Sequence, residues 1–185
     1  MLGLLALSVI LGSCKNESQE KKEVTNPTQD EAVLESNKGQ AFIEDEASTP
    51  NILQIALKSS DHSTLVAAVQ AAELENALVN AGPLMAFAPT NAAFDALPPG
   101  TVEDLLKPEN KDALANILKY HVTPGNYSKD FLKNFKKLGQ ANNQNVAVEV
   151  KDNEVYVGGA KIIASVSAGN GIVHVVDKVI LPPTQ

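Results

Sequence analysis

The distribution of apolar and polar residues divides the chain into three parts. Residues 1–14 are almost continuously apolar, residues 15–48 are polar with scattered apolar positions, and residues 49–185 carry periodic apolar patterns. Only a periodic pattern gives a helix or strand one face to bury against a core. We therefore predict an N-terminal targeting segment over residues 1–14, a flexible charged linker over residues 15–48 and one folded domain over residues 49–185.

Helical patterns dominate the first half of this domain. Residues 51–59 predict a short amphipathic helix, and residues 59–83 predict a longer, alanine-rich helical region that a Gly-Pro pair ends. Further on, apolar side chains spaced by three and four positions over residues 111–125 predict a helix with one buried stripe. His121 falls on that stripe, so we expect its ring to face inward.

The stretch "AFAPTNAAFDALPPG", residues 86–100, requires two turns within a short segment. Pro89 ends an apolar run that predicts a buried strand over residues 84–88. The Thr90 hydroxyl is placed to cap the short helix that follows, and Pro89 and Phe94 have the spacing of a hydrophobic staple. A helix N-terminus after a strand can also bind an anion, but no glycine precedes Thr90 to let a ligand approach. We interpret the stretch as architecture.

Strand patterns dominate the second half of the domain. After a short helical piece in residues 128–137, alternating valines over residues 146–157 predict a hairpin. Two more strands flank Asn170-Gly171, which is a strong turn signal. Residues 172–181 are apolar on both faces, which predicts a central strand that is covered on each side.

The end of the apolar N-terminal run, Leu11-Gly12-Ser13-Cys14, resembles the lipobox of bacterial lipoproteins. Cys14 is the one cysteine of the chain, so an internal disulfide is excluded. The resemblance implies a lipid-modified Cys14 at the mature N-terminus, anchored to a membrane surface without spanning it. We expect the protein at the cell envelope, on the outer membrane or cell surface, or secreted if Cys14 is not lipidated. The alternative is a plain secretory signal with an incidental cysteine.

The three histidines are the main candidates for chemistry. His62 lies in a polar first turn and is expected to be a solvated surface residue. His121 beside Tyr120 is compatible with a general base and a phenol partner, but a buried, hydrogen-bonded imidazole explains the pattern as well. We favour the structural role, because no nucleophile motif or second acid is nearby. His121 and His174 alone make a poor metal site. We therefore predict no catalytic residue, metal or cofactor.

The charge distribution narrows the class of partner. The formal net charge is −7 at pH 7, and residues 15–49 contribute −5 of it through nine acidic residues against four lysines. The rest of the chain is nearly neutral, and no arginine occurs anywhere. It offers neither a basic field for nucleic acid nor a guanidinium clamp for phosphate or carboxylate groups. We therefore do not expect a nucleic-acid partner.

Three motifs together resemble one family. "FAPTNAAFDALPPG", "LKYHVTPG" and "NGIVHVVDKVILPP" resemble the successive signatures of fasciclin-like domains, in the family's order and at its usual separations. The resemblance runs from about Pro50 to Pro183 and implies an α+β fold in which a wedge of β-strands packs against a cluster of short α-helices. The matching signature positions, to which we assign structural roles, are Pro89, Thr90, Asn91, Phe94, Tyr120, His121, Asn170, Gly171, His174 and Asp177.

The same resemblance implies a function. Fasciclin-like domains are mostly extracellular adhesion or matrix-binding modules, so we expect a lipid-anchored module that attaches the cell to matrix, polysaccharide or other cells. Integrin recognition in animal relatives is associated with the tyrosine-histidine segment, which nominates Tyr120, His121 and Val122 as partner-binding residues. The alternative is binding of a small apolar ligand, a pigment or a lipid, as in some algal relatives. An enzyme is disfavoured, because the sequence supplies no nucleophile, metal set or carboxylate pair.

Overall fold

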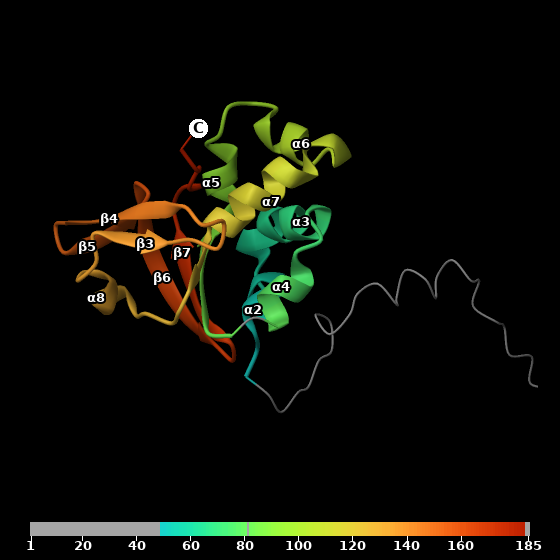
Figure 1. Ribbon diagram of the computed structural model, residues 1–185. Helices are drawn as coiled ribbons and strands as arrows, with labels where there is room; N and C mark the ends of the chain where they lie inside the picture. The colour runs from blue at the N-terminus through green and yellow to red at the C-terminus, as the bar shows by residue number, and fades with distance from the viewer. Residues whose placement is uncertain (1–48, 81, 184–185) are drawn as a thin grey trace, which may run out of the picture.

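A computed structural model describes residues 49–80 and 82–183, which form a mixed α+β domain with helices clustered beside a twisted sheet (Figure 1). The predicted α+β class is therefore confirmed. The targeting segment, Cys14 and the linker over residues 15–48 lie outside the described residues and stay predictions. None of the helices in residues 49–80 and 82–183 is long and apolar enough to cross a lipid bilayer.

The elements follow one another in the order α2, η2, α3, α4, β1, α5, α6, η3, α7, β2, α8, β3 to β7. The helices are α2 (Ile52–Leu57), α3 (Ser63–Ala71), α4 (Glu75–Asn80), α5 (Asn91–Asp95), α6 (Thr101–Leu105), α7 (Lys111–Tyr120) and α8 (Lys129–Leu132), with the 3-10 turns η2 (Ser60–His62) and η3 (Pro108–Asn110). The strands are β1 (Leu84–Pro89), β2 (Val122–Pro124), β3 (Lys137–Gly139), β4 (Asn145–Lys151), β5 (Glu154–Val157), β6 (Ala160–Ala168) and β7 (Gly171–Val176).

The strands form one sheet in the order β2-β1-β7-β6-β5-β4-β3. β1 and β7 pair in parallel, whereas the other neighbours are antiparallel. The prediction of a central, doubly covered strand after Gly171 is confirmed for β7, since Ile172 packs into one core and Val173 into another. The strand ends at Val176 instead of Leu181. There the Asp177 carboxylate accepts a hydrogen bond from the Lys161 backbone N–H at 2.7 Å, which fixes a turn.

The helical region predicted over residues 59–83 is divided, which corrects the expectation of one long helix. α3 ends at Ala71, and Glu73 adopts a left-handed conformation with φ of 54°. Glu73 N–H donates to Gln70 O and Leu74 N–H donates to Val69 O, the two bonds of a Schellman motif. This local closure overrides the helix propensity of the alanines and gives α4 a new direction.

Two apolar layers lie on opposite faces of β1 and β7. The first layer, here called the sheet core, includes Met85 and Phe87 of β1 together with side chains of β4 to β7 and α8. The second layer, here called the helix-side core, lies between α2, α3, α4, α7 and the other face of the sheet, where β1 contributes Leu84, Ala86 and Ala88. β1 therefore presents the bulky Met85 and Phe87 on one face, and Ala86 and Ala88 beside Leu84 on the other.

Candidate functional site

The stretch over residues 86–100 forms a strand end and a short helix, as its residues predict. Thr90 is the N-cap of α5, and its hydroxyl accepts the Ala93 N–H at 3.3 Å. Pro89 is the last residue of β1 and pairs with Val176, while Phe94 is half-buried on α5. The staple contact between Pro89 and Phe94 stays a prediction.

Asn91 fastens the start of α3 to the helix that follows β1. Its side-chain NH₂ donates to Ser60 O at 2.9 Å, and its Oδ1 accepts the Thr64 N–H at 3.1 Å. An amide with both functions at this position satisfies one N–H at the N-terminus of α3 and one carbonyl of η2. Asn91 thus fixes where α3 lies relative to β1.

Asn170 links three elements of the helix side. Its Oδ1 accepts the Ile52 N–H at the start of α2 at 3.0 Å, and its side-chain NH₂ donates to Leu78 O in α4 at 2.6 Å. Its backbone carbonyl accepts the Leu84 N–H at the start of β1 at 3.0 Å. The residue that the sequence marks as a turn signal therefore also holds α2 and α4 in place over the sheet.

His121 is a buried link between α7 and the C-terminal segment. The residue is 4% exposed, its Nδ1 lies 2.8 Å from Ile117 O, and its Nε2 accepts the Ile180 N–H at 3.0 Å. Because Nε2 accepts, the proton resides on Nδ1, which donates to the carbonyl. Burial lowers the pKa of His121 to about 4. Both ring nitrogens are thus engaged and the ring is neutral at pH 7.

Tyr120 and Val122, the neighbours of His121, differ in how much surface they expose to a partner. The Tyr120 ring is buried, and its hydroxyl donates to Asn145 O at 3.0 Å. Val122 is half-buried. The assignment of Tyr120, His121 and Val122 as partner-binding residues stays a prediction, but two of its three side chains lie in the core, where burial leaves them little surface to present.

His174 is fully buried in the sheet core. Its Nε2 lies 2.9 Å from Tyr127 O and its Nδ1 lies 2.7 Å from Ser165 Oγ, so the imidazole donates to the carbonyl and accepts from the hydroxyl. The ring also stacks on Phe87 at a centroid distance of 5.8 Å. Burial lowers the pKa of His174. His174 therefore joins β7, β6 and the segment before α8.

His62 is buried, which corrects the expectation of a solvated surface ring. It is 8% exposed, and its Nδ1 lies 2.7 Å from Ser59 Oγ. Its Nε2 makes no hydrogen bond of standard geometry within the described residues. Burial lowers the pKa of His62, against smaller opposite effects of Asp61 and the Ala88 backbone. Sequence reasoning missed this because η2 packs against α5 and the His62 ring lies at the Ala88 backbone of β1, both distant in sequence.

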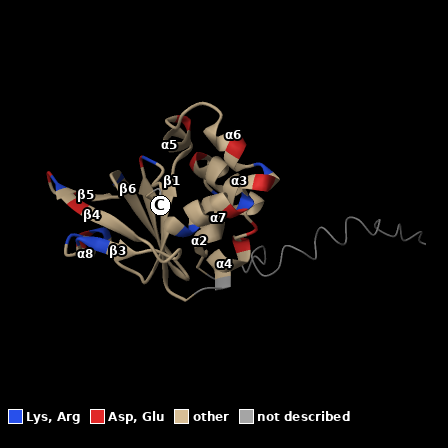
Figure 2. Ribbon diagram, turned by 45° about the horizontal axis from the view of Figure 1, so that its top comes forward, with Lys and Arg blue, Asp and Glu red and all other residues tan. Residues whose placement is uncertain are grey.

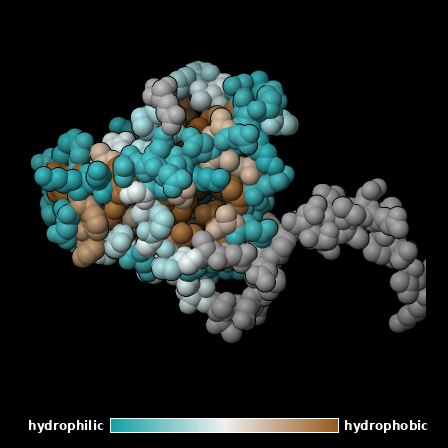
Figure 3. All heavy atoms as spheres, in the orientation of Figure 1, coloured by the Kyte–Doolittle hydropathy of each residue, from teal (hydrophilic) through white to brown (hydrophobic). Residues whose placement is uncertain are grey.

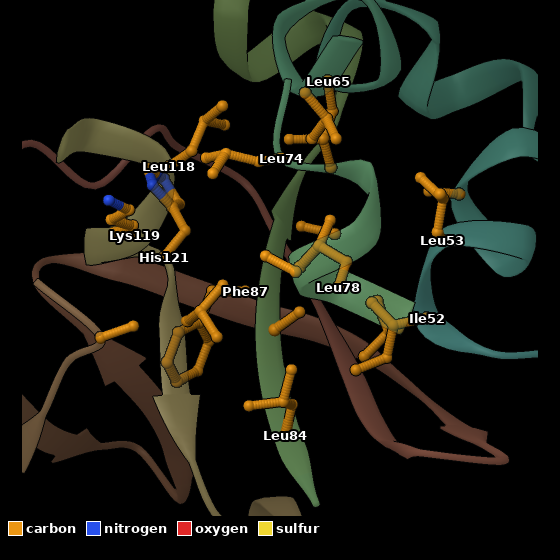
Figure 4. A pocket seen from close by; sticks show the side chains of 18 of the residues that line it. Ile52, Leu53, Leu65, Leu74, Leu78, Leu84, Phe87, Leu118, Lys119 and His121 are labelled. Carbon is orange, nitrogen blue, oxygen red and sulfur yellow. The ribbon is translucent and has the colours of Figure 1, made fainter. Parts of the chain in front are cut away.

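An apolar cavity of about 240 Å³ lies between the helices and β1 (Figure 4). Leu53 of α2, Val69 of α3, Leu78 of α4 and Leu118 of α7 line it on the helix side, and Ala86 lines it on the sheet side. Lys119 and His121 carry the only polar side-chain atoms among its lining residues. The cavity thus lies at the boundary between the helices and the sheet, where β1 presents its small side chains.

The cavity opens to the surface. Three of its lining residues are exposed: Ala77 on α4, Lys119 near the end of α7 and Ala141 in the loop before β4. Figure 3 shows hydrophobic atoms at the bottom of a hollow on this face of the molecule. In Figure 4, Lys119 and His121 lie at one end of the group of side chains, and Ile52 and Leu84 lie toward the other.

A second surface feature is an aromatic cluster formed by Tyr127, Phe131 and Phe135. The centroids of Phe131 lie 5.6 Å from those of both Tyr127 and Phe135, and the Phe131 side chain is 50% exposed. Figure 3 shows hydrophobic atoms among hydrophilic ones over α8, which carries Phe131. This aromatic cluster lies against the sheet core and is separate from the cavity.

The charged side chains of the described residues do not converge on a metal site. Within residues 49–80 and 82–183, no three His, Cys, Asp or Glu side chains lie together so as to hold a metal ion. Lysines and carboxylates occur on both the helices and the strand ends (Figure 2). Several ion pairs of the described residues, such as Lys111–Glu73 at 2.6 Å, include a well exposed partner, so these pairs stabilise the fold only slightly.

The fold and the ordered motifs define an α+β module, and comparison with known proteins identifies its family. The chain matches the Fasciclin domain family model over residues 60–182, and it belongs to this family. It is 46% identical over 160 residues to Protein sll1483 of Synechocystis sp. (strain ATCC 27184 / PCC 6803 / Kazusa), covering 85% of this chain and 88% of that protein.

Two further matches come from a mycobacterial protein and an insect protein. The chain is 35% identical over 107 residues to the cell surface glycolipoprotein MPB83 of Mycobacterium bovis (strain BCG / Tokyo 172 / ATCC 35737 / TMC 1019), covering 58% of this chain and 47% of that protein. A FAS1 domain pair from the insect cell adhesion molecule fasciclin I matches with a TM-score of 0.49 and 20% identity, covering 61% of this chain and 42% of that chain. Relatives of this domain thus include a cell-surface protein.

Sequence reasoning missed the cavity, although one signal for it is present. The run "LMAFAP" alternates large and small side chains, so that Met85 and Phe87 face the sheet core while Ala86 and Ala88 face the helices. Small residues on one face of a buried strand leave space unless the opposite layer fills it. The positions of α2 and α4, on which the filling depends, are not visible in the local pattern.

Proposed function

We propose that this protein is a surface-displayed binding module, held at a membrane by a lipid on Cys14, and that it attaches the cell to polysaccharide. The lipobox-like Leu11-Gly12-Ser13-Cys14 supports the anchor, and so does the relation to a cell surface glycolipoprotein. The polar residues 15–48 are long enough to hold the domain clear of the membrane as a charged tether.

The observation that carries the choice of partner is the aromatic cluster of Tyr127, Phe131 and Phe135. A half-exposed phenylalanine that rests on two other rings is fixed at little entropic cost, and such aromatic groups are enriched in binding surfaces. The face of a sugar ring presents C–H groups that pack on an aromatic ring, while its hydroxyls need polar partners. Asp130 and Asn134, which are exposed and near Phe131 in the sequence, supply such partners through their remaining acceptor and donor capacity.

The charge of the domain agrees with a neutral sugar polymer. The chain has no arginine, and the acidic excess lies mainly in residues 15–49, so the domain provides no strong field for an anionic polymer. Four lysines follow one another along this segment, at positions 129, 133, 136 and 137. Lys133 pairs with Asp130 at 2.9 Å and donates to Asn153 at 3.0 Å, and Lys129 pairs with Glu154 at 2.6 Å. A polysaccharide that binds here is therefore held by stacking and hydrogen bonds, and many weak contacts along a polymer add up through avidity.

The contact surface is tested with the full chain carrying Cys14→Ser, incubated with insoluble envelope polysaccharide of the producing cell, with a neutral glucan and with an acidic polysaccharide. Retention on neutral material should fall about tenfold or more for Phe131→Ala, the scale of an interface hot spot. The matched control is Leu181→Ala, which truncates a side chain of similar exposure, 52%, at another place. Equal retention of the two variants contradicts the proposed surface.

The anchor is tested separately by fractionation of cells. Wild-type protein should remain with membranes and incorporate labelled fatty acid, whereas Cys14→Ser should incorporate none and appear in the soluble fraction, because the one thiol available for lipidation is removed. Membrane association and labelling that survive Cys14→Ser contradict the anchor and leave the contact surface to be judged by its own test.

A further inference from the structure

The interior of the apolar cavity offers a ligand no free side-chain hydrogen-bond donor or acceptor. His121 and Lys119 are its only lining residues with polar side-chain atoms. Both nitrogens of His121 already bond to the Ile117 carbonyl and the Ile180 N–H. A ligand group inside the cavity therefore finds no unused side-chain donor or acceptor, apart from Lys119 at the mouth. Hydrocarbon suits such a space, since burying an unpaired polar group is unfavourable.

The volume limits the length of that hydrocarbon. A dry cavity of about 150 Å³ lined by Leu, Ile and Phe holds benzene, which has six carbons. The cavity in this protein measures about 240 Å³. By the same proportion it accommodates about ten carbon atoms. This is the size of a medium-length alkyl chain and much less than that of a whole phospholipid.

The framework around the cavity is held open by hydrogen bonds that do not involve its lining side chains. Asn170 binds the N-terminus of α2 and the Leu78 carbonyl of α4, and Asn91 binds the N-terminus of α3. These bonds fix the helices by their ends. The helices therefore cannot settle onto Ala86 and Ala88 without breaking them, and the space is preserved by the same residues that mark the family signature.

The mouth of the cavity carries one positive charge. Lys119 is exposed, and none of the ion pairs or side-chain hydrogen bonds within the described residues involves it. The other two exposed residues at the mouth, Ala77 and Ala141, are small and leave the opening clear. An unpaired ammonium beside an apolar opening favours a ligand with an anionic end and a hydrocarbon tail.

We propose that the cavity binds a free medium-chain fatty acid, with about ten carbons inside and the carboxylate at the Lys119 ammonium. This site goes beyond the surface contact by Phe131 and uses none of the same residues. A protein displayed at a membrane would thereby carry a single amphiphile under its helices, in addition to binding a polymer on the opposite layer.

The hydrocarbon part of the proposal is tested with a series of fatty acids on the full chain carrying Cys14→Ser. Hexanoate, octanoate, decanoate and hexadecanoate displace a fluorescent apolar probe, N-phenyl-1-naphthylamine, and the dissociation constants are compared below their micelle concentrations. Affinity should rise about fourfold for each added methylene up to about ten carbons and then level off, as expected for burial in a closed space. Affinity independent of chain length overturns the proposal.

The carboxylate is tested with decanol, which has the same tail without the charge. Wild-type protein should prefer decanoate by about threefold, the scale of a partly exposed ion pair. Lys119→Gln should remove this preference, and the matched control Lys178→Gln, another exposed lysine, should retain it. Equal binding of decanoate and decanol by the wild-type protein overturns the charged contact at Lys119.

The location is tested by closing the mouth from two sides. Ala77→Trp on α4 and Ala141→Trp in the loop before β4 place a large ring over the opening, and each should weaken decanoate binding at least tenfold while circular dichroism remains that of the wild type. Because the two variants are on different elements, a local folding failure in one leaves the other to test the site. The chain-length series requires neither variant. Undiminished binding in either folded variant overturns the site. Phe131→Ala should leave decanoate binding unchanged, so this site and the polysaccharide surface fail independently.

Discussion

The two faces of β1 and β7 are packed in opposite ways. On one face Met85 and Phe87 enter the sheet core, where Val155, Val157 and Ile162 are 0% exposed. On the other face Ala86 and Ala88 look toward short helices, and a cavity of about 240 Å³ remains. The sheet core therefore stabilises the fold through dense packing. The other layer also buries apolar side chains of the helices, but it retains a cavity beside them.

The largest expected loss of stability comes from a substitution at Gly171, where β7 approaches β1 closely. A Cβ on Gly171 would lie 1.8 Å from the Leu84 carbonyl oxygen, at a φ of +155°. Gly171→Ala must therefore separate β7 from β1, and we expect a loss of roughly 4 kcal/mol or more of unfolding free energy, which urea denaturation measures. The control Gly159→Ala has a φ of +81° with no atom within 4 Å. It should cost only about 1 kcal/mol. Similar losses in both variants would contradict the close approach of the strands.

Acid should weaken the link between the two layers at His121. Its pKa is about 4 in the fold, below the ordinary 6.5, so folding favours the neutral ring. The stabilisation is complete above about pH 6.5 and is lost as the pH falls toward 4, by about 3 kcal/mol in total. Burial lowers the pKa of His62 and His174 in the same direction. Urea denaturation between pH 7.5 and 4.5 checks this loss. A slope as steep in His121→Gln as in the wild type would show that His121 does not carry it.

A matched pair of substitutions tests the packing difference itself. Ala160→Val adds two methyl groups in the sheet core, where Ala160 is 1% exposed, and should cost about 1–3 kcal/mol by overpacking. Ala86→Val adds the same groups beside the cavity and should change the unfolding free energy by less than about 1 kcal/mol, because space is available. Urea denaturation of both variants gives the two values. Equal losses of unfolding free energy in the two variants would show that the cavity does not accommodate the added methyl groups.

The sequence predicts the local structure of each helix and strand better than it predicts where the helices end and how they pack together. Thr90, the hairpin over residues 146–157 and the central position of β7 follow from local pattern, because capping, turn and alternation rules act over a few residues. The break at Glu73 does not follow, since a Schellman closure competes with alanine helix propensity at similar energy. Short-range rules are therefore sufficient for fold class and insufficient for helix ends.

At the candidate site, too, local sequence patterns predict some features and miss those that depend on contacts between distant segments. His121 was expected to face inward, and its ring is buried. The burial of His62 and the cavity depend on contacts between residues that are remote along the chain, such as those of Asn170 with α2 and α4. No periodicity in a single segment encodes them. The alternation of Met85, Ala86, Phe87 and Ala88 is the one local sign that the helix side is less filled.

Amide hydrogen exchange with and without decanoate shows whether the helix side of β1 and β7 holds a ligand while the sheet core stabilises the fold. We predict slower exchange in α2, α3, α4 and the end of α7, whose side chains line the cavity, with no change in α8 and β4 to β6. Protection confined to α8 and β4 to β6, or no protection at saturating decanoate, would show that the helix side of β1 and β7 does not bind this ligand.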